Sequence, residues 1–201
     1  MTDIKSNLNI KYFYRLLLSL LVIICVAQQF SSASNIEAKI ISIQGPDLLS
    51  GRLVDLTPGT KGSVVVFMSA RCPCSDSHVE ILKKLSSEYK DFSFSVIHSN
   101  ADEPIELSKA YFSKKNLPFK VIQDIDGKLA DHYKALKTPH AYIVDPKGNI
   151  LYRGGMTSST NGETADKQFL KDALNDISLG QPVKVAEGRT LGCIISRNTQ
   201  K

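Results

Sequence analysis

Short apolar runs and longer helical patterns alternate along the chain from residue 39 onward. Runs rich in β-branched and aromatic residues indicate strands at 64–67, 92–97, 119–122, 141–144 and 150–152. Between and after these runs, apolar residues recur at helical spacing, which predicts helices at 78–90, 104–116 and 169–177. The chain is therefore expected to interleave strands with helices.

The order of these segments predicts how they assemble. The turn sequence Asp145-Pro-Lys-Gly148 joins the last two strands as an antiparallel hairpin, whereas helices connect the earlier strands. This order, closed by a final helix, indicates an α/β fold with a central mixed β-sheet that helices cover on both faces. We expect one domain over residues 35–182 and a flexible, poorly structured C-terminal tail over residues 183–201.

The first 34 residues follow a different pattern. Lys5, Lys11 and Arg15 precede an apolar segment at 16–27, and a polar stretch with small residues follows it. That order is typical of a secretory signal peptide, and the apolar segment is shorter than the roughly 20 residues that a spanning helix needs. We therefore expect a cleaved signal peptide over residues 1–34 and an exported, periplasmic protein. The alternative is an uncleaved signal that anchors the chain in a membrane.

The charge of the chain excludes one class of partner. The formal net charge is +5, and it falls to +3 when the three positive charges and one negative charge of residues 1–34 are removed. Since the chain also has no basic run interleaved with aromatic residues, nucleic acid is not expected as a partner. No later apolar stretch is long enough to cross a membrane, so a membrane is a partner only if the signal stays uncleaved.

Three cysteines lie after the signal segment, at Cys72, Cys74 and Cys193. An odd number cannot all pair within one chain in an oxidising compartment, so at least one thiol is free or transiently bonded. Cys72 follows the strand at 64–67, at the point where a helix is expected to begin. Unpaired backbone N–H groups at a helix start stabilise a thiolate over a thiol, and the thiolate is the reactive form. The pattern predicts a redox site at Cys72.

Two segments of the sequence resemble a known family. Residues 67–72, Phe-Met-Ser-Ala-Arg-Cys, resemble the passage from strand to nucleophile in thioredoxin-fold proteins. Residues 137–154 resemble the Thr-Pro turn, strand, hairpin and strand of the same fold. The resemblance is closest to the exported redoxins grouped with the alkyl hydroperoxide reductase and thiol-specific antioxidant proteins (AhpC/TSA). It implies a thioredoxin-like fold over about residues 40 to 180.

The resemblance also implies roles for three residues. Cys72 is implied to be the nucleophile of a thiol-disulfide oxidoreductase that works through a mixed disulfide. The peptide bond before Pro139 is implied to be cis, a form nearly confined to bonds that precede proline. Pro139 is also implied to lie against Cys72. The backbone of Thr138 is implied to pair with an extended substrate segment. The expected partners are protein thiols or disulfides and a second redox protein, and no cofactor is expected.

One position departs from the thioredoxin pattern. Thioredoxins carry their second cysteine three residues after the first, where this chain has Ser75. If Cys72 and Cys74 both lay in the helix, a rotation of roughly 200° would turn their side chains apart, whereas a disulfide needs converging β-carbons. The Gly-Cys sequence at Cys193 resembles the ending of some exported redoxins. Cys74 and Cys193 therefore both stay open as candidates for the resolving cysteine.

Two other functions stay open. A thiol peroxidase, with a peroxide as substrate, places a hydroxyl three residues before its cysteine, as Ser69 is here. The proline that precedes this hydroxyl in peroxiredoxins is missing, which favours disulfide exchange. His98 and His132 are interpreted as surface or strand-end residues. The other alternative is a copper-binding or copper-delivery protein, because soft thiolates select copper; its ligands would be Cys72, Cys74, His78 and His140.

Overall fold

The computed structural model describes residues 43–198 of the chain. The predicted signal peptide or anchor at residues 1–34 lies outside this range, as do residues 199–201 at the end of the predicted tail. Within residues 43–198, no helix is long and apolar enough to cross a membrane.

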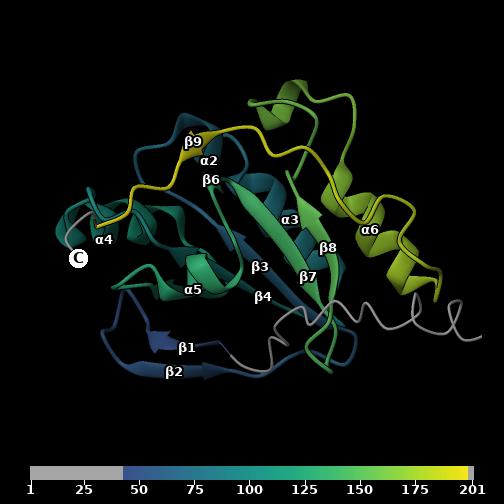
Figure 1. Cartoon of the computed structure of the whole chain (residues 1–201), viewed down its shortest axis with the longest axis horizontal. Helices are drawn as coiled ribbons and strands as arrows, with labels where there is room; N and C mark the ends of the chain where they lie inside the picture. Colours follow the sequence, from purple (N-terminus) through teal and green to yellow (C-terminus); the bar gives the residue numbers. More distant parts are fainter. Residues whose placement is uncertain (1–42, 199–201) are drawn as a thin grey trace, which may run out of the picture. The chain divides into compact units, whose positions relative to one another are not determined.

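A five-stranded mixed sheet forms the centre of the fold (Figure 1). Strand β3 runs parallel to β4 and β4 parallel to β5, whereas β7 is antiparallel to both β3 and β8. Helices connect the parallel strands, while a turn closed by the Gly148 N–H and the Asp145 carbonyl, 2.9 Å apart, joins β7 to β8. The predicted mixed α/β sheet is confirmed. In spatial order the strands are β5 (Lys120–Gln123), β4 (Phe92–His98), β3 (Gly62–Phe67), β7 (His140–Val144) and β8 (Ile150–Gly154).

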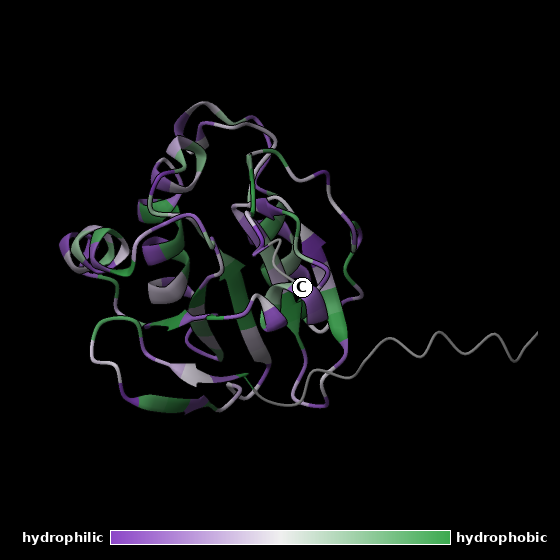
Figure 2. Ribbon diagram, turned by 60° about the vertical axis from the view of Figure 1, so that its left-hand side comes forward, coloured by the Kyte–Doolittle hydropathy of each residue, from purple (hydrophilic) through white to green (hydrophobic). Residues whose placement is uncertain are grey.

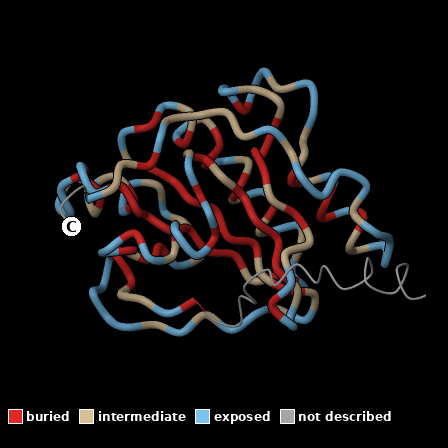
Figure 3. Tube along the Cα trace, viewed as in Figure 1, coloured by how far each residue is buried: buried red, intermediate tan, exposed pale blue. Residues whose placement is uncertain are grey.

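Side chains that alternate along the strands pack into two hydrophobic clusters, one on each face of the sheet. In β3, Val64 and Val66 belong to the first cluster and Val65 and Phe67 to the second, as the period of two requires. Buried residues follow the strands in Figure 3, and the hydrophobic colour of Figure 2 follows the same strands. Helices cover the first cluster, namely α3 (Val79–Glu88), α4 (Ile105–Lys115) and α6 (Phe169–Ser178). The second cluster is covered by α5 (Lys128–His132) and by the hairpin of β1 (Ile43–Pro46) and β2 (Leu53–Leu56).

The long periodic segments form the predicted elements, and the short ones escaped prediction. Helices α3, α4 and α6 lie within or close to the predicted ranges. The short elements hold too few residues to display a period. The elements outside every predicted range are β1, β2, α2 (Pro73–Asp76), α5, β6 (Lys137–Thr138), the 3-10 helix η1 (Gly162–Thr164) and β9 (Cys193–Ile194).

The prediction of a poorly structured tail is wrong for residues 183–198. Strand β9 pairs antiparallel with β6, and the side chain of Ile195 is buried in the second cluster. Figure 1 shows the tail, in yellow, leaving α6 and passing α2 and β6 on its way toward α4. We call residues 186–197 the strap. Its structure depends on contacts with distant parts of the chain, which is why local sequence did not reveal it.

Candidate active site

Cys72 lies where strand β3 gives way to helix α2. It is the N-cap of α2, and its backbone is extended, with φ −83° and ψ 114°. Pro73 takes the first helical position, where a missing N–H loses no hydrogen bond. The Cys72 carbonyl accepts the first helical hydrogen bond, from the Asp76 N–H at 3.0 Å. The side chain is thus held outside the helix and is only 2% exposed.

The thiol of Cys72 contacts the turn that contains Pro139. The peptide bond between Thr138 and Pro139 is cis, and the Cys72 Sγ donates to the Thr138 carbonyl at 3.2 Å. The sheet brings these segments together, because β7 begins directly after Pro139 and pairs its His140 with Phe67 of β3. The cis bond and its position beside Cys72 match the expectation from the resemblance, while the roles of Thr138 and Pro139 stay predictions.

Three thiols meet at this turn. The Sγ atoms of Cys72, Cys74 and Cys193 all lie within 4.8 Å of one another, and all three cysteines are free. Cys74 does not turn away from Cys72, because Cys72 precedes the helix and the rotation expected between two helical positions does not apply. Cys193 comes from the strap, where β9 places it opposite Thr138. Both candidates for the resolving cysteine therefore lie beside Cys72.

The surroundings of Cys72 favour its thiolate. Burial alone would raise the pKa of this thiol, but the side chain and backbone of Cys193, the nearby Thr138 and the Ser75 N–H lower the pKa to about 7. Burial and the neighbouring Cys72 raise the pKa of Cys74. Burial and the hydrogen bond to Cys72 raise the pKa of Cys193 to about 12. Of the three thiols, Cys72 therefore ionises most readily near neutral pH, and the other two keep their protons.

The alkylation rate of Cys72 by iodoacetamide should follow its thiolate. We expect the rate to rise with pH and to level off after a midpoint near the pKa of about 7, whereas Cys74 and Cys193 react slowly at neutral pH. Time-resolved labelling of the reduced protein, read by peptide mass spectrometry at each cysteine, measures this. A Cys72 midpoint at or above about 8.5, the value of a free cysteine, would contradict the described environment.

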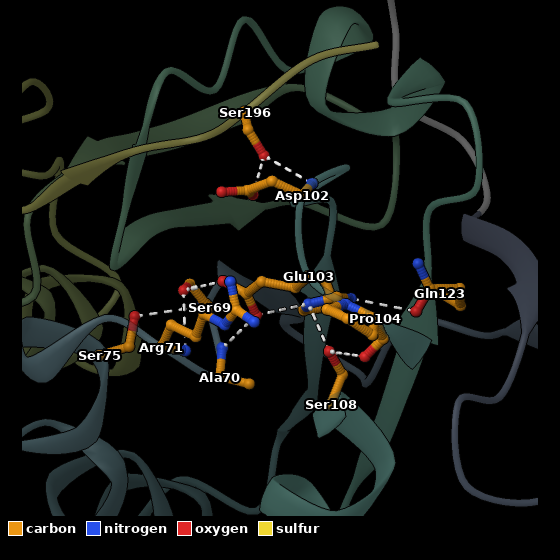
Figure 4. Close-up of polar contacts among 11 residues, drawn as sticks. Ser69, Ala70, Arg71, Ser75, Asp102, Glu103, Pro104, Ser108, Gln123 and Ser196 are labelled. Atoms are coloured by element: carbon orange, nitrogen blue, oxygen red, sulfur yellow. Dashed lines mark hydrogen bonds and ion pairs between the residues drawn. The ribbon is translucent and has the colours of Figure 1, made fainter. Parts of the chain in front are cut away.

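A buried carboxylate holds the loop that leads to Cys72 (Figure 4). One oxygen of Glu103 accepts from the Ser69 hydroxyl, and the other accepts from the Ala70 N–H at 2.8 Å. His98 donates to the same carboxylate through Nε2 at 3.0 Å. Burial would raise the pKa of Glu103, but the hydrogen bonds from His98, Ser69 and Ala70 lower it. Glu103 is therefore an ionised anchor for the backbone just before the nucleophile.

Sequence reasoning missed Glu103 and placed His98 only in part. His98 is the last residue of β4, as a strand-end residue should be, but it is fully buried and its Nδ1 lies 3.0 Å from Gln123 Oε1. Glu103 lies in the loop between β4 and α4, in a stretch with no period of its own. The sequence held one indirect signal for Glu103. If β3 and β4 are parallel, both end at the same edge of the sheet, so the residues that follow β4 lie near Cys72, which follows β3.

The residues expected of a peroxidase are not gathered at the thiol. The hydroxyl of Ser69 donates to Glu103 and accepts from the Arg71 N–H at 3.2 Å. It is therefore engaged in the loop. Peroxiredoxins also place an arginine beside their cysteine, but the side chain of Arg71, the residue before Cys72, is exposed. This arrangement favours disulfide exchange over peroxide reduction.

The histidines of the alternative copper site do not join the thiols. His78 donates through Nδ1 to the Cys74 carbonyl at 2.7 Å, and its Nε2 lies 2.8 Å from the Thr157 hydroxyl. The Nδ1 of His140 lies 3.2 Å from the Tyr142 hydroxyl, and burial lowers the pKa of His140 to about 4. In the described part of the chain, the group of possible metal ligands that does come together is the three thiols, a set suited to a soft ion such as Cu(I).

A curated protein and a family share sequence with this chain. Residues 35–153 match the AhpC/TSA family. The chain is 26% identical over 151 residues to the thiol-disulfide oxidoreductase ResA of Halalkalibacterium halodurans, an alignment that covers 70% of this chain and 86% of that protein.

Solved structures share the fold. An uncharacterized conserved protein from Geobacillus kaustophilus matches with a TM-score of 0.73 and 25% identity, over 81% of this chain and 92% of that one. A hypothetical protein from Sinorhizobium meliloti matches with a TM-score of 0.71 and 23% identity, over 81% of this chain and 94% of that one. A secreted disulfide oxidoreductase from Mycobacterium tuberculosis matches with a TM-score of 0.52 and 20% identity, over 69% and 96%. The resemblance seen in the sequence is confirmed: the chain has a thioredoxin-like fold and belongs to the AhpC/TSA family.

Proposed function

We propose that this protein is a thiol-disulfide oxidoreductase with Cys72 as its nucleophile. The observation that carries the proposal is the environment of the Cys72 thiol. This thiol is buried beside Pro139, its pKa is lowered to about 7, and the sulfurs of two other cysteines lie within 4.8 Å of it. Disulfide exchange needs a thiolate that attacks and a second thiol that resolves. The match to ResA, itself a thiol-disulfide oxidoreductase, supports the same chemistry.

The proposed reaction exchanges sulfur bonds in two steps. The Cys72 thiolate attacks one sulfur of a substrate disulfide, and the other substrate sulfur leaves as a thiolate that takes up a proton. Cys74 or Cys193 then gives up its proton and attacks the Cys72 sulfur of the mixed disulfide, and the second substrate thiolate leaves. The substrate gains two electrons, and the protein holds one internal disulfide. The same steps in reverse oxidise a dithiol substrate.

The unequal pKa values assign the order of these steps. Cys72 attacks first because it ionises more readily near neutral pH than Cys74 and Cys193 do. In the reverse direction, a substrate thiolate attacks the Cys72 sulfur of the internal disulfide, and Cys74 or Cys193 leaves as a thiolate that takes up a proton.

Substrate and compartment complete the proposal. Protein thiols or disulfides are the proposed substrates, with the Thr138 backbone and Pro139 as the surface that holds them, and a second redox protein returns Cys72 to its starting state. We propose export to the periplasm through residues 1–34, or a membrane anchor if that segment is uncleaved. The signal-like order of charged, apolar and polar residues supports this part.

Turnover of two substrates tests the proposed reaction. With dithiothreitol as the electron source, we expect the protein to reduce insulin disulfides at least tenfold faster than dithiothreitol alone, because Cys72 is ionised where most of the reagent is not. Hydrogen peroxide consumption under the same conditions should stay close to the blank. Rapid peroxide consumption without insulin reduction would contradict the proposal and favour the peroxidase alternative.

A further inference from the structure

The strap lies where a substrate is proposed to bind. Strand β9 pairs antiparallel with β6, so that Cys193 is opposite Thr138 and Ile194 opposite Lys137. The Thr138 backbone, which the proposed function assigns to an extended substrate segment, is therefore already paired with the chain's own residues. The cysteine of this pairing segment lies within 4.8 Å of the Cys72 sulfur, which is where a substrate sulfur has to be.

Contacts on both sides of β9 hold the strap in place. Before β9, the Arg153 N–H donates to the Ala186 carbonyl, and the Gly188 N–H donates to the Arg153 carbonyl, both at 2.9 Å. After β9, the Ile195 N–H donates to the Leu136 carbonyl at 3.0 Å, and the Ile195 side chain is 4% exposed. The strap thus has an apolar anchor directly beyond the paired residues.

Polar contacts fasten the end of the strap. Ser196 contacts Asp102 twice, through the Asp102 carboxylate and through the Asp102 N–H at 3.1 Å (Figure 4). Arg197 donates to the Asp131 carboxylate at 3.0 Å and to the Ala135 carbonyl at 2.8 Å. Asp102 directly precedes Glu103, so the strap ends on the same loop that fixes the backbone before Cys72.

Glycine at position 192 permits this close pairing. Gly192 has a positive φ of 146°, and a β-carbon there would collide with the Thr138 carbonyl oxygen. Any other residue before Cys193 would push the strap away from Thr138. The Gly-Cys sequence therefore fits the surface beside Cys72 in a way that few sequences can.

The site is closed while the strap is in place. Cys72 is 2% exposed and Thr138 1% exposed, so an extended protein segment cannot reach either residue in this arrangement. A strap and a substrate segment cannot pair with Thr138 at the same time. Access for a protein substrate requires the strap to leave.

We propose that the strap is an internal stand-in for the substrate, which an extended segment carrying glycine followed by cysteine must displace before Cys72 attacks. The inference rests on the proposed function and names its substrate class. The observed rate of exchange with such a segment then scales with the fraction of molecules whose strap is open. Weakening the strap raises that rate by opening the site, although an open strap also removes the Cys193 hydrogen bond that lowers the pKa of Cys72.

The strap also separates the roles of the two neighbouring thiols. When a substrate segment holds the place of β9, Cys193 is displaced with the strap, while Cys74 stays on α2 beside Cys72. Cys74 is then the thiol that resolves a mixed disulfide with a protein segment. After the segment has left and the strap has returned, Cys193 gives up its proton and attacks the Cys72 sulfur of the Cys72–Cys74 disulfide, and Cys74 leaves as a thiolate that takes up a proton.

The test compares strap variants of the full chain with one defined probe. The probe is a synthetic peptide with the sequence of residues 188–197, whose cysteine forms a mixed disulfide with thionitrobenzoate, so that attack releases a coloured thiolate. Arg197→Ala removes both contacts of that side chain, and we expect release about tenfold faster than from the wild type. Asp131→Asn should shift the rate in the same direction by less. Arg189→Ala, at an exposed arginine of the same strap, is the matched control and should leave the rate unchanged.

A second peptide tests whether the strap resembles the substrate. Valine replaces the glycine that corresponds to Gly192, and we expect this peptide to react at least tenfold more slowly with Arg197→Ala than the glycine peptide does. Equal rates in the wild type, Arg197→Ala and Asp131→Asn would overturn the strap as a barrier. Equal rates for the two peptides would overturn it as a substrate stand-in. If the wild type also failed to reduce 2-hydroxyethyl disulfide, a small substrate, the proposed function itself would be contradicted.

Discussion

Replacing Cys72 by serine is expected to abolish insulin-disulfide reduction, with turnover falling to that of dithiothreitol alone. A serine hydroxyl does not ionise near neutral pH and forms no disulfide, so neither the attack nor the mixed disulfide is available. Any residual peroxide consumption should disappear as well, because both chemistries need the same thiolate. The insulin assay, run with wild type and variant at equal concentration, measures the loss.

The other two cysteines supply matched controls for this variant. Cys74→Ser and Cys193→Ser keep the attacking thiolate, so each should still form a first bond to substrate through Cys72. The thiol-to-hydroxyl change is the same in all three variants, and their circular dichroism spectra should agree with that of the wild type. Substantial insulin reduction by Cys72→Ser, or failure of both Cys74→Ser and Cys193→Ser to form a first bond to substrate through Cys72, would contradict Cys72 as the nucleophile.

Replacing Glu103 by alanine should cause the largest loss of stability. The change removes the acceptor of the hydrogen bonds from Ser69, Ala70 and His98 in a site where the Glu103 side chain is 2% exposed. Breaking a buried charged network by deleting one partner costs about 3–5 kcal/mol. Urea unfolding of the reduced protein, followed by circular dichroism, measures the difference in free energy of unfolding.

Two further variants isolate the part that the carboxylate contributes. Glu103→Gln keeps the size and one acceptor oxygen but loses the charge, and we expect a smaller cost of about 1–3 kcal/mol. Glu106→Ala removes a glutamate that is 81% exposed and should change stability by less than about 0.5 kcal/mol. A cost for Glu103→Ala as small as that for Glu106→Ala would contradict the described network.

The stability that Glu103 contributes should depend on pH in one direction. Its pKa is lowered in the folded protein from the ordinary value of 4.5, so the folded protein binds this proton less readily than the unfolded chain. The contribution is therefore fully present above pH 4.5 and is lost as the pH falls through the folded-state pKa. The difference in free energy of unfolding between wild type and Glu103→Gln should therefore narrow in that acidic range. A difference that stays constant down to about pH 3 would contradict an ionised Glu103.

The sheet could be predicted because its signals are local. Residues 64–67 and 92–97 are apolar enough to mark buried strands by themselves, and the helix at 79–88 shows its apolar face through Val79, Leu82 and Leu85. Cys72 could be found for the same reason, because it follows the apolar strand pattern of residues 64–67 and stands where a helix is expected to begin. Pro139 needed the family resemblance, because a proline beside a strand is by itself an ordinary turn residue.

The rest of the site depends on contacts between distant residues. Glu103 acts on Ser69 across 34 positions, and nothing near Glu103 in the sequence marks it as an anchor. Cys193 reaches Thr138 because Ile195 finds a place in the second hydrophobic cluster. Residues 183–198 have neither helical nor strand periodicity, so the sequence indicated a loose tail where the structure has a fastened strap.

Disulfide mapping by mass spectrometry tests whether Cys72 is the reactive thiol. The metal-free protein is oxidised with a small excess of 2-hydroxyethyl disulfide, quenched with acid, digested without reduction and read at all three thiols. We predict that Cys72 is found bonded, either to the reagent or to Cys74 or Cys193. A bond between Cys74 and Cys193 that leaves Cys72 as a free thiol would contradict it.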